Sequence, residues 1–189
     1  MSEGGFHVHG PHDHAVEHAA HDAKDKFSGR VAVPTAVLAT VGATFGYLGG
    51  ATQNDAAMFK NDAAIKKTEA SNQWNYYQAK SNKQSLSELA ITLNANPERF
   101  KQEVERYKAE KEGIKKEAEK LEAESLEWDK KSEESLHQHH RWALATTAEQ
   151  IAIALAAITL LTRKRWVEIA SYGVAIAGVA VGMLAALHI

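Results

Sequence analysis

Histidines near the start of the chain are the most obvious potential metal ligands in the sequence. His14, His18 and His21 would share one face of a helix, because spacings of four and three residues correspond to about one turn. Such a face can bind Zn²⁺ or Ni²⁺, but a flexible His-rich tract also binds these ions adventitiously. Gly10 and Pro11 favour the second interpretation. We therefore predict no resident cofactor, only adventitious Zn²⁺ or Ni²⁺ on this tract.

Glu149 and Gln150 are polar residues inside an apolar stretch. A carboxylate at membrane depth is costly, so such residues are expected to face protein or water rather than lipid. Two interpretations of Glu149 stay open: a protonated or hydrogen-bonded side chain that holds helices together, and part of a proton or cation pathway. No catalytic residue is predicted, because no activated nucleophile, phosphate-binding loop or pair of inward-facing acids is found. We expect the chain not to be an enzyme.

Three apolar stretches are long enough to cross a membrane as helices. A span needs roughly 20 apolar residues to cross a hydrocarbon core of about 30 Å. The last two stretches are separated only by a basic segment, which predicts a turn at a headgroup layer. The predicted segments are a polar His-rich tail at 1–30, spans at 31–50, 142–162 and 167–189, a basic turn at 163–166, and a charged region at 51–141.

The charged region is predicted to be a helical hairpin with its turn at 94–97, because Pro97 suits the first position of a helix. The arms 51–93 and 98–141 are nearly equal in length, so the chain leaves the membrane and returns to it. We therefore predict an all-α membrane protein with three transmembrane helices and a long antiparallel, coiled-coil-like hairpin between the first and second.

Apolar residues recur near a 3.5-residue period along the second arm, which indicates coiled-coil packing. Lys111 and Ser125 are expected to interrupt this seam. Large side chains are expected opposite the small ones of the first arm, with Trp128 against Ala63. Such packing lets the two helices approach each other without leaving cavities.

Basic and aromatic residues mark the expected membrane boundaries, where tryptophan lies at headgroup level and cations contact phosphates. The interface residues are Arg141, Trp142, Arg163, Lys164, Arg165 and Trp166. His137, His139 and His140 belong to the same belt, or alternatively form a pH-responsive collar. The basic flanks before the first span and between the last two spans place the N-terminus in the cytoplasm and the hairpin in the periplasm.

Glycines at four-residue spacing indicate close helix packing within the membrane. The predicted packing residues are Gly42, Gly46 and Gly50 in the first span, with Gly178 and Gly182 in the third. Such faces do not distinguish contacts within one chain from contacts between chains.

Aromatic and basic residues form a distinctive cluster at Trp74, Tyr76, Tyr77 and Lys80. Their segment, Ser-Asn-Gln-Trp-Asn-Tyr-Tyr-Gln-Ala-Lys-Ser at 71–81, resembles the signature of a bacterial membrane family called domain of unknown function 4337. The basic flank and first span, His139-His140 and the segment 162–166 extend this resemblance over most of 26–189. It implies a bacterial inner membrane and this architecture, and it assigns no catalytic residue.

The aromatic cluster fits either the hairpin interior or a contact patch for another subunit or an unidentified protein partner. A formal charge of −2 argues against nucleic-acid binding, so the expected partners are the lipid bilayer and other copies in a homo-oligomer. We predict a self-associating structural or interaction protein of the inner membrane. The alternative is an oligomeric ion or proton pathway centred on Glu149.

Overall fold

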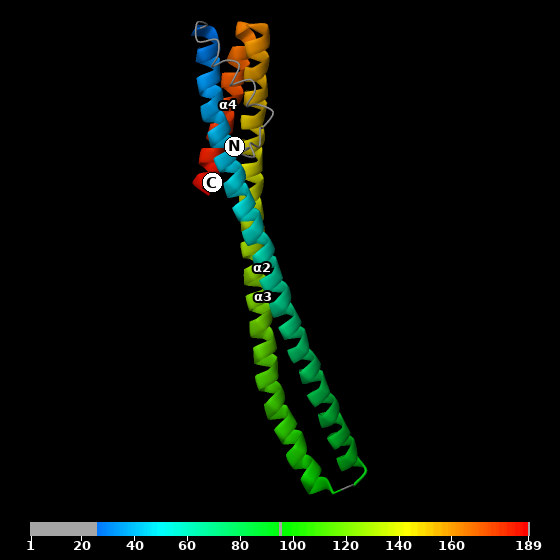
Figure 1. Cartoon of the computed structure of the whole chain (residues 1–189). Helices are drawn as coiled ribbons and strands as arrows, with labels where there is room; N and C mark the ends of the chain where they lie inside the picture. Colours follow the sequence, from blue (N-terminus) through cyan, green and yellow to red (C-terminus); the bar gives the residue numbers. More distant parts are fainter. Residues whose placement is uncertain (1–25, 95, 189) are drawn as a thin grey trace, which may run out of the picture. The chain divides into compact units, whose positions relative to one another are not determined.

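The computed structural model describes residues 26–94 and 96–188, and every regular element within these ranges is a helix. Helix α2 spans Lys26–Thr92, α3 spans Pro97–Thr162 and α4 spans Arg165–Ala186 (Figure 1). Each helix contains an apolar stretch long enough to cross a membrane, with a mean hydropathy of 1.6, 1.7 and 1.9 respectively. The chain is therefore all-helical, with two long helices and one short one, and these stretches indicate a membrane protein.

Each long helix contains both an apolar stretch and a charged arm. Helix α2 continues through Gly49 and Gly50 without a break, because glycine weakens a helix but does not prevent it. Pro34 lies within α2 rather than at its first turn. The basic turn is shorter than predicted, since α4 already includes Arg165 and Trp166, and Arg163 adopts a positive φ of 54°.

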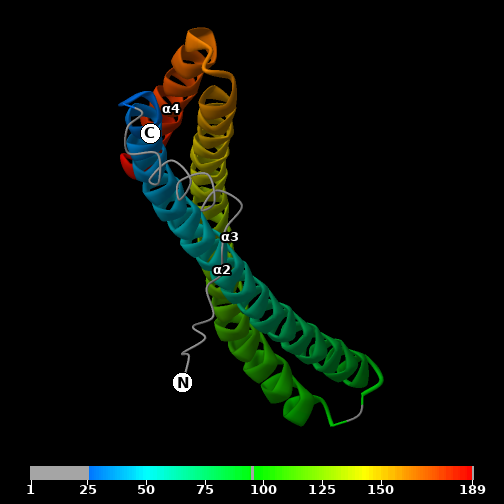
Figure 2. The same cartoon turned by 45° about the horizontal axis from the view of Figure 1, so that its top comes forward.

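The chain divides into two compact units. Unit 1 contains the described residues up to Gln53 and those from Leu136 onwards, and unit 2 is Asn54–Ser135. In unit 1 the beginning of α2, the end of α3 and the whole of α4 lie side by side (Figure 2). Its interior is formed mainly by small and aliphatic residues. The most buried of these are Val31, Ala145, Ala152, Ala156, Val167, Ala175 and Ala185.

Hydrogen bonds from polar side chains to backbone carbonyls join α3 to α4 in unit 1. The Ser171 hydroxyl donates to the Ala152 carbonyl at 2.8 Å. The Gln138 amide donates to the Ala185 carbonyl, which lies in the last turn of α4. The same carbonyl also accepts a hydrogen bond from the His188 backbone N–H, so Gln138 adds a second bond, from a neighbouring helix, at the end of α4.

Alanine and serine, together with Val104 and Leu121, are buried in the interior of unit 2. Ser125 and Ser132 are buried, and their hydroxyls donate to the carbonyls of Ala63 at 2.9 Å and Ala56 at 2.8 Å. Residue numbers that rise along α2 therefore meet numbers that fall along α3. Contacts between a hydroxyl and a backbone carbonyl require the two helix backbones to lie close together, which small side chains permit.

This interior differs from the sequence prediction in the register of its contacts. Ser125, expected to interrupt the seam, lies inside it and hydrogen-bonds at the level of Ala63. The Trp128 ring instead stacks on Phe59, with ring centroids 5.7 Å apart. The prediction overlooked that a serine hydroxyl can be buried at no great cost when a carbonyl accepts its hydrogen bond.

Two asparagines shape the connection between α2 and α3. Asn94 and Asn96 adopt positive φ values of 58° and 41°, a region that asparagine tolerates better than most residues. Helix α3 then begins at Pro97, whose fixed φ suits a first helical position. The chain thus turns where the sequence predicts it.

Ion pairs connect the two helices along the borders of the unit 2 interior. They join Lys60 to Asp129, Lys66 to Glu124, Lys67 to Glu122 and Lys80 to Glu110. Most of these side chains are partly or largely exposed, so water screens each pair. The pairs therefore orient the helices more than they stabilise them.

Candidate functional site

The most unusual group in unit 1 is the carboxyl group of Glu149. Its side chain is fully buried, at 0% exposure, although it lies in the apolar stretch of α3. Gly42 of α2 and Gly178 of α4 approach it from two sides. Three helices therefore enclose this one acidic side chain.

The two glycines make room for the Glu149 side chain. A Cβ atom placed on Gly178 would lie 2.7 Å from Glu149 Oε1, and one on Gly42 would lie 3.2 Å from Glu149 Cβ. The first distance is too short for any real Cβ atom, so a larger residue at 178 would displace the carboxyl group. Sequence analysis identified both glycines as packing residues but did not link them to Glu149.

Neither carboxyl oxygen of Glu149 has a hydrogen-bond partner among the described residues. The hydroxyls of Thr146 and Thr147, which lie nearby in sequence, donate to the carbonyls of Trp142 and Ala143 in their own helix. A buried polar group without a partner is costly, and its charged form is far more costly still. The arrangement therefore differs from the hydrogen-bonded contact between helices that the sequence allowed.

Gln150, in contrast to Glu149, is exposed on the surface of unit 1. The sequence analysis expected both polar residues of this stretch to face protein or water. Adjacent helical residues point about 100° apart, so burying Glu149 turns the Gln150 amide outwards. An amide on the outer surface of a membrane-spanning stretch lacks water as a partner.

The glycine contacts of α2 differ in one position from those predicted. A Cβ on Gly46 would lie 3.8 Å from Thr146 Cγ2, which places Gly46 against α3. Gly50 is exposed, and a Cβ there would meet nothing within 4 Å. Gly49 takes its place: it is buried, and a Cβ on it would lie 3.2 Å from Trp142 Cβ. Gly49 follows Gly46 by three residues, a spacing that a pattern of small residues every four positions does not predict.

Gly182 permits contact between α4 and α2 in the same unit. A Cβ at this position would collide with the ring of Phe45. Phe45 also packs against Trp142, with ring centroids 5.4 Å apart. Trp142 is consequently buried at 5% exposure, so its ring packs inside unit 1, and its position at headgroup level stays a prediction.

The other predicted interface residues are more accessible, and the two basic flanks meet at one end of unit 1. Arg141 is half-buried, Trp166 is 68% exposed, and Arg163, Lys164 and Arg165 are exposed. Arg30 of α2 forms an ion pair with Glu168 of α4, with Nη2 and Oε1 3.1 Å apart. The Arg163 guanidinium lies 5.8 Å from the centroid of the Phe27 ring. Both predicted cytoplasmic flanks therefore belong to the same end.

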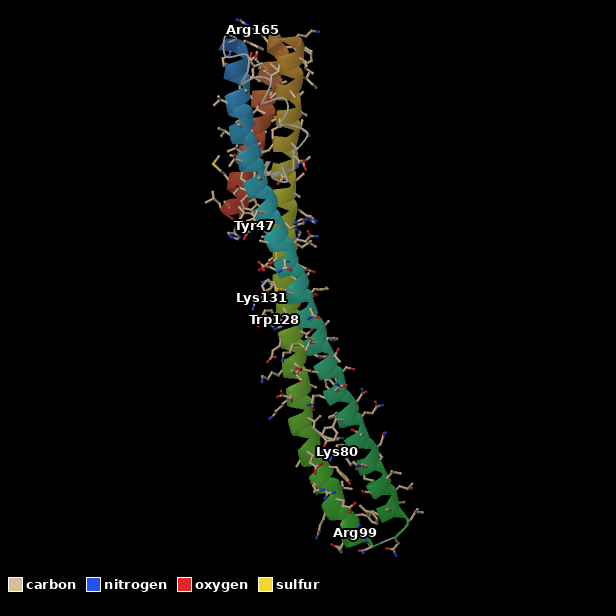
Figure 3. All side chains as sticks on the ribbon, viewed as in Figure 1. Tyr47, Lys80, Arg99, Trp128, Lys131 and Arg165 are labelled. Atoms are coloured by element: carbon tan, nitrogen blue, oxygen red, sulfur yellow. The ribbon has the colours of Figure 1, made fainter. Side chains whose placement is uncertain are left out.

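In unit 2, Lys80 of α2, which is labelled in Figure 3, lies against two tyrosine rings. Lys80 Nζ lies 5.1 Å from the Tyr76 ring centroid and 5.6 Å from that of Tyr107, and it pairs with Glu110. The hydrogen bond between Lys80 and Glu110 raises the pKa of the lysine above its ordinary value and lowers the pKa of the carboxyl. Lys80 therefore acts as a cation held between α2 and α3.

Aromatic residues of the same segment divide between the interior and the surface. Trp74 and Tyr77 are half-buried and meet edge to face, with ring centroids 5.7 Å apart. Lys111, predicted to interrupt the seam, lies with its Nζ 5.1 Å from the Tyr77 ring centroid, an attractive arrangement for a cation. Tyr76 is 51% exposed. Tyr77 and Lys80 thus contact side chains of α3, and Tyr76 lies beside Lys80 at the surface.

The predicted metal ligands His14, His18 and His21 lie outside the described residues. Within 26–94 and 96–188, no three His, Asp or Glu side chains are grouped so that they could hold a metal ion. His139 Nδ1 instead lies 2.8 Å from the Gly49 carbonyl, and its ring is 5.7 Å from that of His140. This histidine takes part in the packing of α2 against α3.

Sequence reasoning missed Gln138 and Ser171, which are both buried and both bond α3 to α4. Gln138 lies at the border of an apolar stretch, and Ser171 lies inside one. This position is the sequence signal that could have identified them. Neutral polar side chains are less costly in an apolar stretch than ionisable ones, so their positions are a weaker signal in the sequence.

The described residues thus define an all-helical protein with three helices able to cross a membrane. The chain belongs to the family described as Domain of unknown function (DUF4337), whose model matches residues 27–188. No curated protein and no solved structure matches the chain. The family description names no activity, so the function must be argued from the residues.

Proposed function

We propose that the chain is a self-associating interaction protein of the bacterial inner membrane. In this proposal unit 1 spans the bilayer as three helices, and unit 2 is an antiparallel, coiled-coil-like hairpin that projects from it. The observation that carries self-association is the exposure of Gln150 on unit 1, in the apolar stretch of α3. Lipid offers this amide no hydrogen-bond partner, whereas a second copy does.

A glutamine is suited to contact its own counterpart, because its amide contains both donors and an acceptor. Two copies related by a twofold axis can therefore pair Gln150 with Gln150 by reciprocal hydrogen bonds. Polar contacts of this kind between membrane helices contribute about 0.6–2 kcal/mol each. That is enough to favour an oligomer when the chains are concentrated in a membrane.

The test replaces Gln150 in the full chain reconstituted in lipid vesicles. We expect Gln150→Leu to weaken association about threefold to tenfold, as energy transfer between labelled copies would show at several ratios of protein to lipid. Ile151→Leu is the matched control, because Ile151 is 50% exposed in the same turn and contributes no polar group. A wild-type chain that stays monomeric at every ratio would refute self-association.

The proposed orientation places the basic end of unit 1 in the cytoplasm and the hairpin in the periplasm. It is supported by the basic flanks, which the positive-inside rule assigns to the cytoplasmic side. The chain has no cysteine, so single introduced cysteines can be labelled without background. An impermeant thiol reagent added to intact cells should label Glu105→Cys and spare Lys164→Cys. The reverse pattern would overturn the orientation.

A second candidate function, an oligomeric proton or ion pathway, is favoured by the buried and unpaired carboxyl of Glu149. Intramembrane acids of this kind commonly belong to proton or ion pathways. If this candidate is correct, vesicles containing the wild-type chain should dissipate an imposed proton gradient, and Glu149→Gln should abolish the flux while the oligomer remains. Equal leakage from wild type, Glu149→Gln and empty vesicles would exclude it.

A further inference from the structure

One stripe of exposed residues along α2 in unit 2 carries no charge. Its central positions follow spacings of three and four residues in alternation from residue 58 to residue 93. All of them are exposed, and none is Asp, Glu, Lys or Arg. Alternating spacings of three and four place residues in one continuous stripe along a helix. We call this stripe the outer seam. Its residues are Met58, Asn61, Ile65, Thr68, Asn72, Asn75, Ala79, Asn82, Leu86, Leu89 and Leu93.

The outer seam lies on the side of α2 away from α3. The residues of α2 that are buried against α3 include Ala56, Ala63 and Ala70, which follow a different seven-residue repeat. Met58 and Ile65 each lie two positions further along, about 200° around the helix from those alanines. Contacts within the described chain therefore leave the outer seam uncovered.

Large apolar residues occupy both ends of the outer seam. Met58 and Ile65 are 57% and 47% exposed at one end, and Leu86, Leu89 and Leu93 are 65%, 54% and 71% exposed at the other. Solvent normally selects charged residues at such positions, as it does on α3. Lack of charge together with exposed apolar side chains is the composition of an interface core rather than of a solvated surface.

Amide side chains fill the middle of the outer seam. Asn72, Asn75 and Asn82 lie there, with Asn61 near the first end. An asparagine amide both donates and accepts, so each of these residues can pair with the same residue of a second copy. Asparagine at such positions of a coiled coil also determines its register and number of strands. A lipid surface or a strongly charged partner would offer no comparable match.

We infer that the outer seam of α2 is the surface on which a second copy of this chain docks, in parallel orientation and in register. The inference rests on the proposed anchoring in a membrane, because two copies inserted the same way present their α2 helices in parallel. Each seam residue then meets its own counterpart, so that leucine packs on leucine from residue 86 to 93 and asparagine pairs with asparagine at 61, 72, 75 and 82. The charged outer face of α3 stays in solvent.

The first test uses single cysteines in the full chain in vesicles, where the lack of native cysteine removes any background. Asn75→Cys on the outer seam should form a disulfide between copies under mild oxidation, since counterparts meet at the twofold axis. Glu105→Cys, on the exposed side of α3, should not. Equal cross-linking of both, or of neither, would overturn the inference.

The second test places charge on the outer seam in the Asn75→Cys chain. Leu86→Lys combined with Leu89→Lys should reduce the cross-linked fraction about tenfold, because like charges would face each other in the dimer. Leu126→Lys is the matched control: Leu126 is 70% exposed on α3 and should have no effect. An equal loss from both changes would contradict a specific seam.

Failure of this inference can be distinguished from failure of the proposed function. If the chain does not insert in membranes, alkaline carbonate will extract it from vesicles, and the proposed function fails. If the chain resists extraction, associates through Gln150 and still does not cross-link at residue 75, only the outer seam is refuted.

Discussion

Unit 1 and unit 2 both bring helices close together with small residues, but they use the resulting space differently. In unit 1, glycines face large side chains, as Gly178 faces Glu149 and Gly182 faces Phe45. In unit 2, alanines face serines whose hydroxyls bond to backbone carbonyls, and ion pairs border the contact. The proposed surroundings, lipid for unit 1 and water for unit 2, explain the difference. Lipid gives no reward for burying apolar surface, so packing shape dominates there, whereas water favours a charged border.

The largest loss of stability is expected when the space that a glycine provides in unit 1 is removed. We expect Gly178→Leu to destabilise unit 1 by about 3 kcal/mol, because overpacking a close contact displaces both Glu149 and Ala148. Unfolding in SDS, followed by tryptophan fluorescence, measures this loss. Gly173→Leu is the control, since a Cβ at Gly173 meets nothing within 4 Å. Similar losses from both variants would show that Gly178 is not a close contact.

The next largest effect is expected in the interior of unit 2. Ser125→Ala and Ser132→Ala each remove one buried hydrogen bond and leave a carbonyl of α2 without that partner. Each should cost about 1 kcal/mol, measured by urea unfolding of unit 2 in the full chain with circular dichroism. Ser85→Ala, at an exposed position, should cost nothing. If the serine variants match this control, ion pairs rather than hydroxyls align the helices.

The ion pairs at the border of the unit 2 interior should affect stability least. The pH dependence of unfolding measures their effect. Lys80 lowers the pKa of Glu110. The contribution of the Glu110 carboxylate to the stability of unit 2 is therefore present above pH 4.5, the ordinary pKa, and is lost as pH falls through the lowered pKa. Glu110 in turn raises the pKa of Lys80. The contribution of the Lys80 ammonium group to the stability of unit 2 is therefore present below pH 10.5, the ordinary pKa, and is lost as pH rises through the raised pKa. The urea midpoint of Lys80→Gln should therefore vary less with pH than that of wild type at both extremes.

Lys116→Gln provides the comparison for this pH experiment. Lys116 is exposed and forms no ion pair with another described residue. Its variant should follow the pH dependence of wild type. A Lys80→Gln profile that coincides with wild type would mean that the Lys80–Glu110 pair has no net influence on unit 2.

Hydropathy and turn chemistry predicted the elements of the fold from sequence, because apolar length and the Asn-Pro signal act locally. The three apolar stretches and the turn before Pro97 were found in this way. Contacts between helices were predicted less well, since they depend on how backbones approach each other in three dimensions. Glu149 was recognised by its depth, but its enclosure by Gly42 and Gly178 and the exposure of Gln150 could not be read from spacing alone.

The interior of unit 2 repeats, and this repetition has a consequence for folding. Ala56, Ala63 and Ala70 lie seven residues apart, as do Ser132 and Ser125 on the facing helix. If one arm slid by seven positions, Ser132 would reach the level of Ala63 and find an equivalent carbonyl. These contacts therefore permit several alignments of nearly equal quality. The short connection at 93–96, which leaves no slack for such sliding, selects one of them.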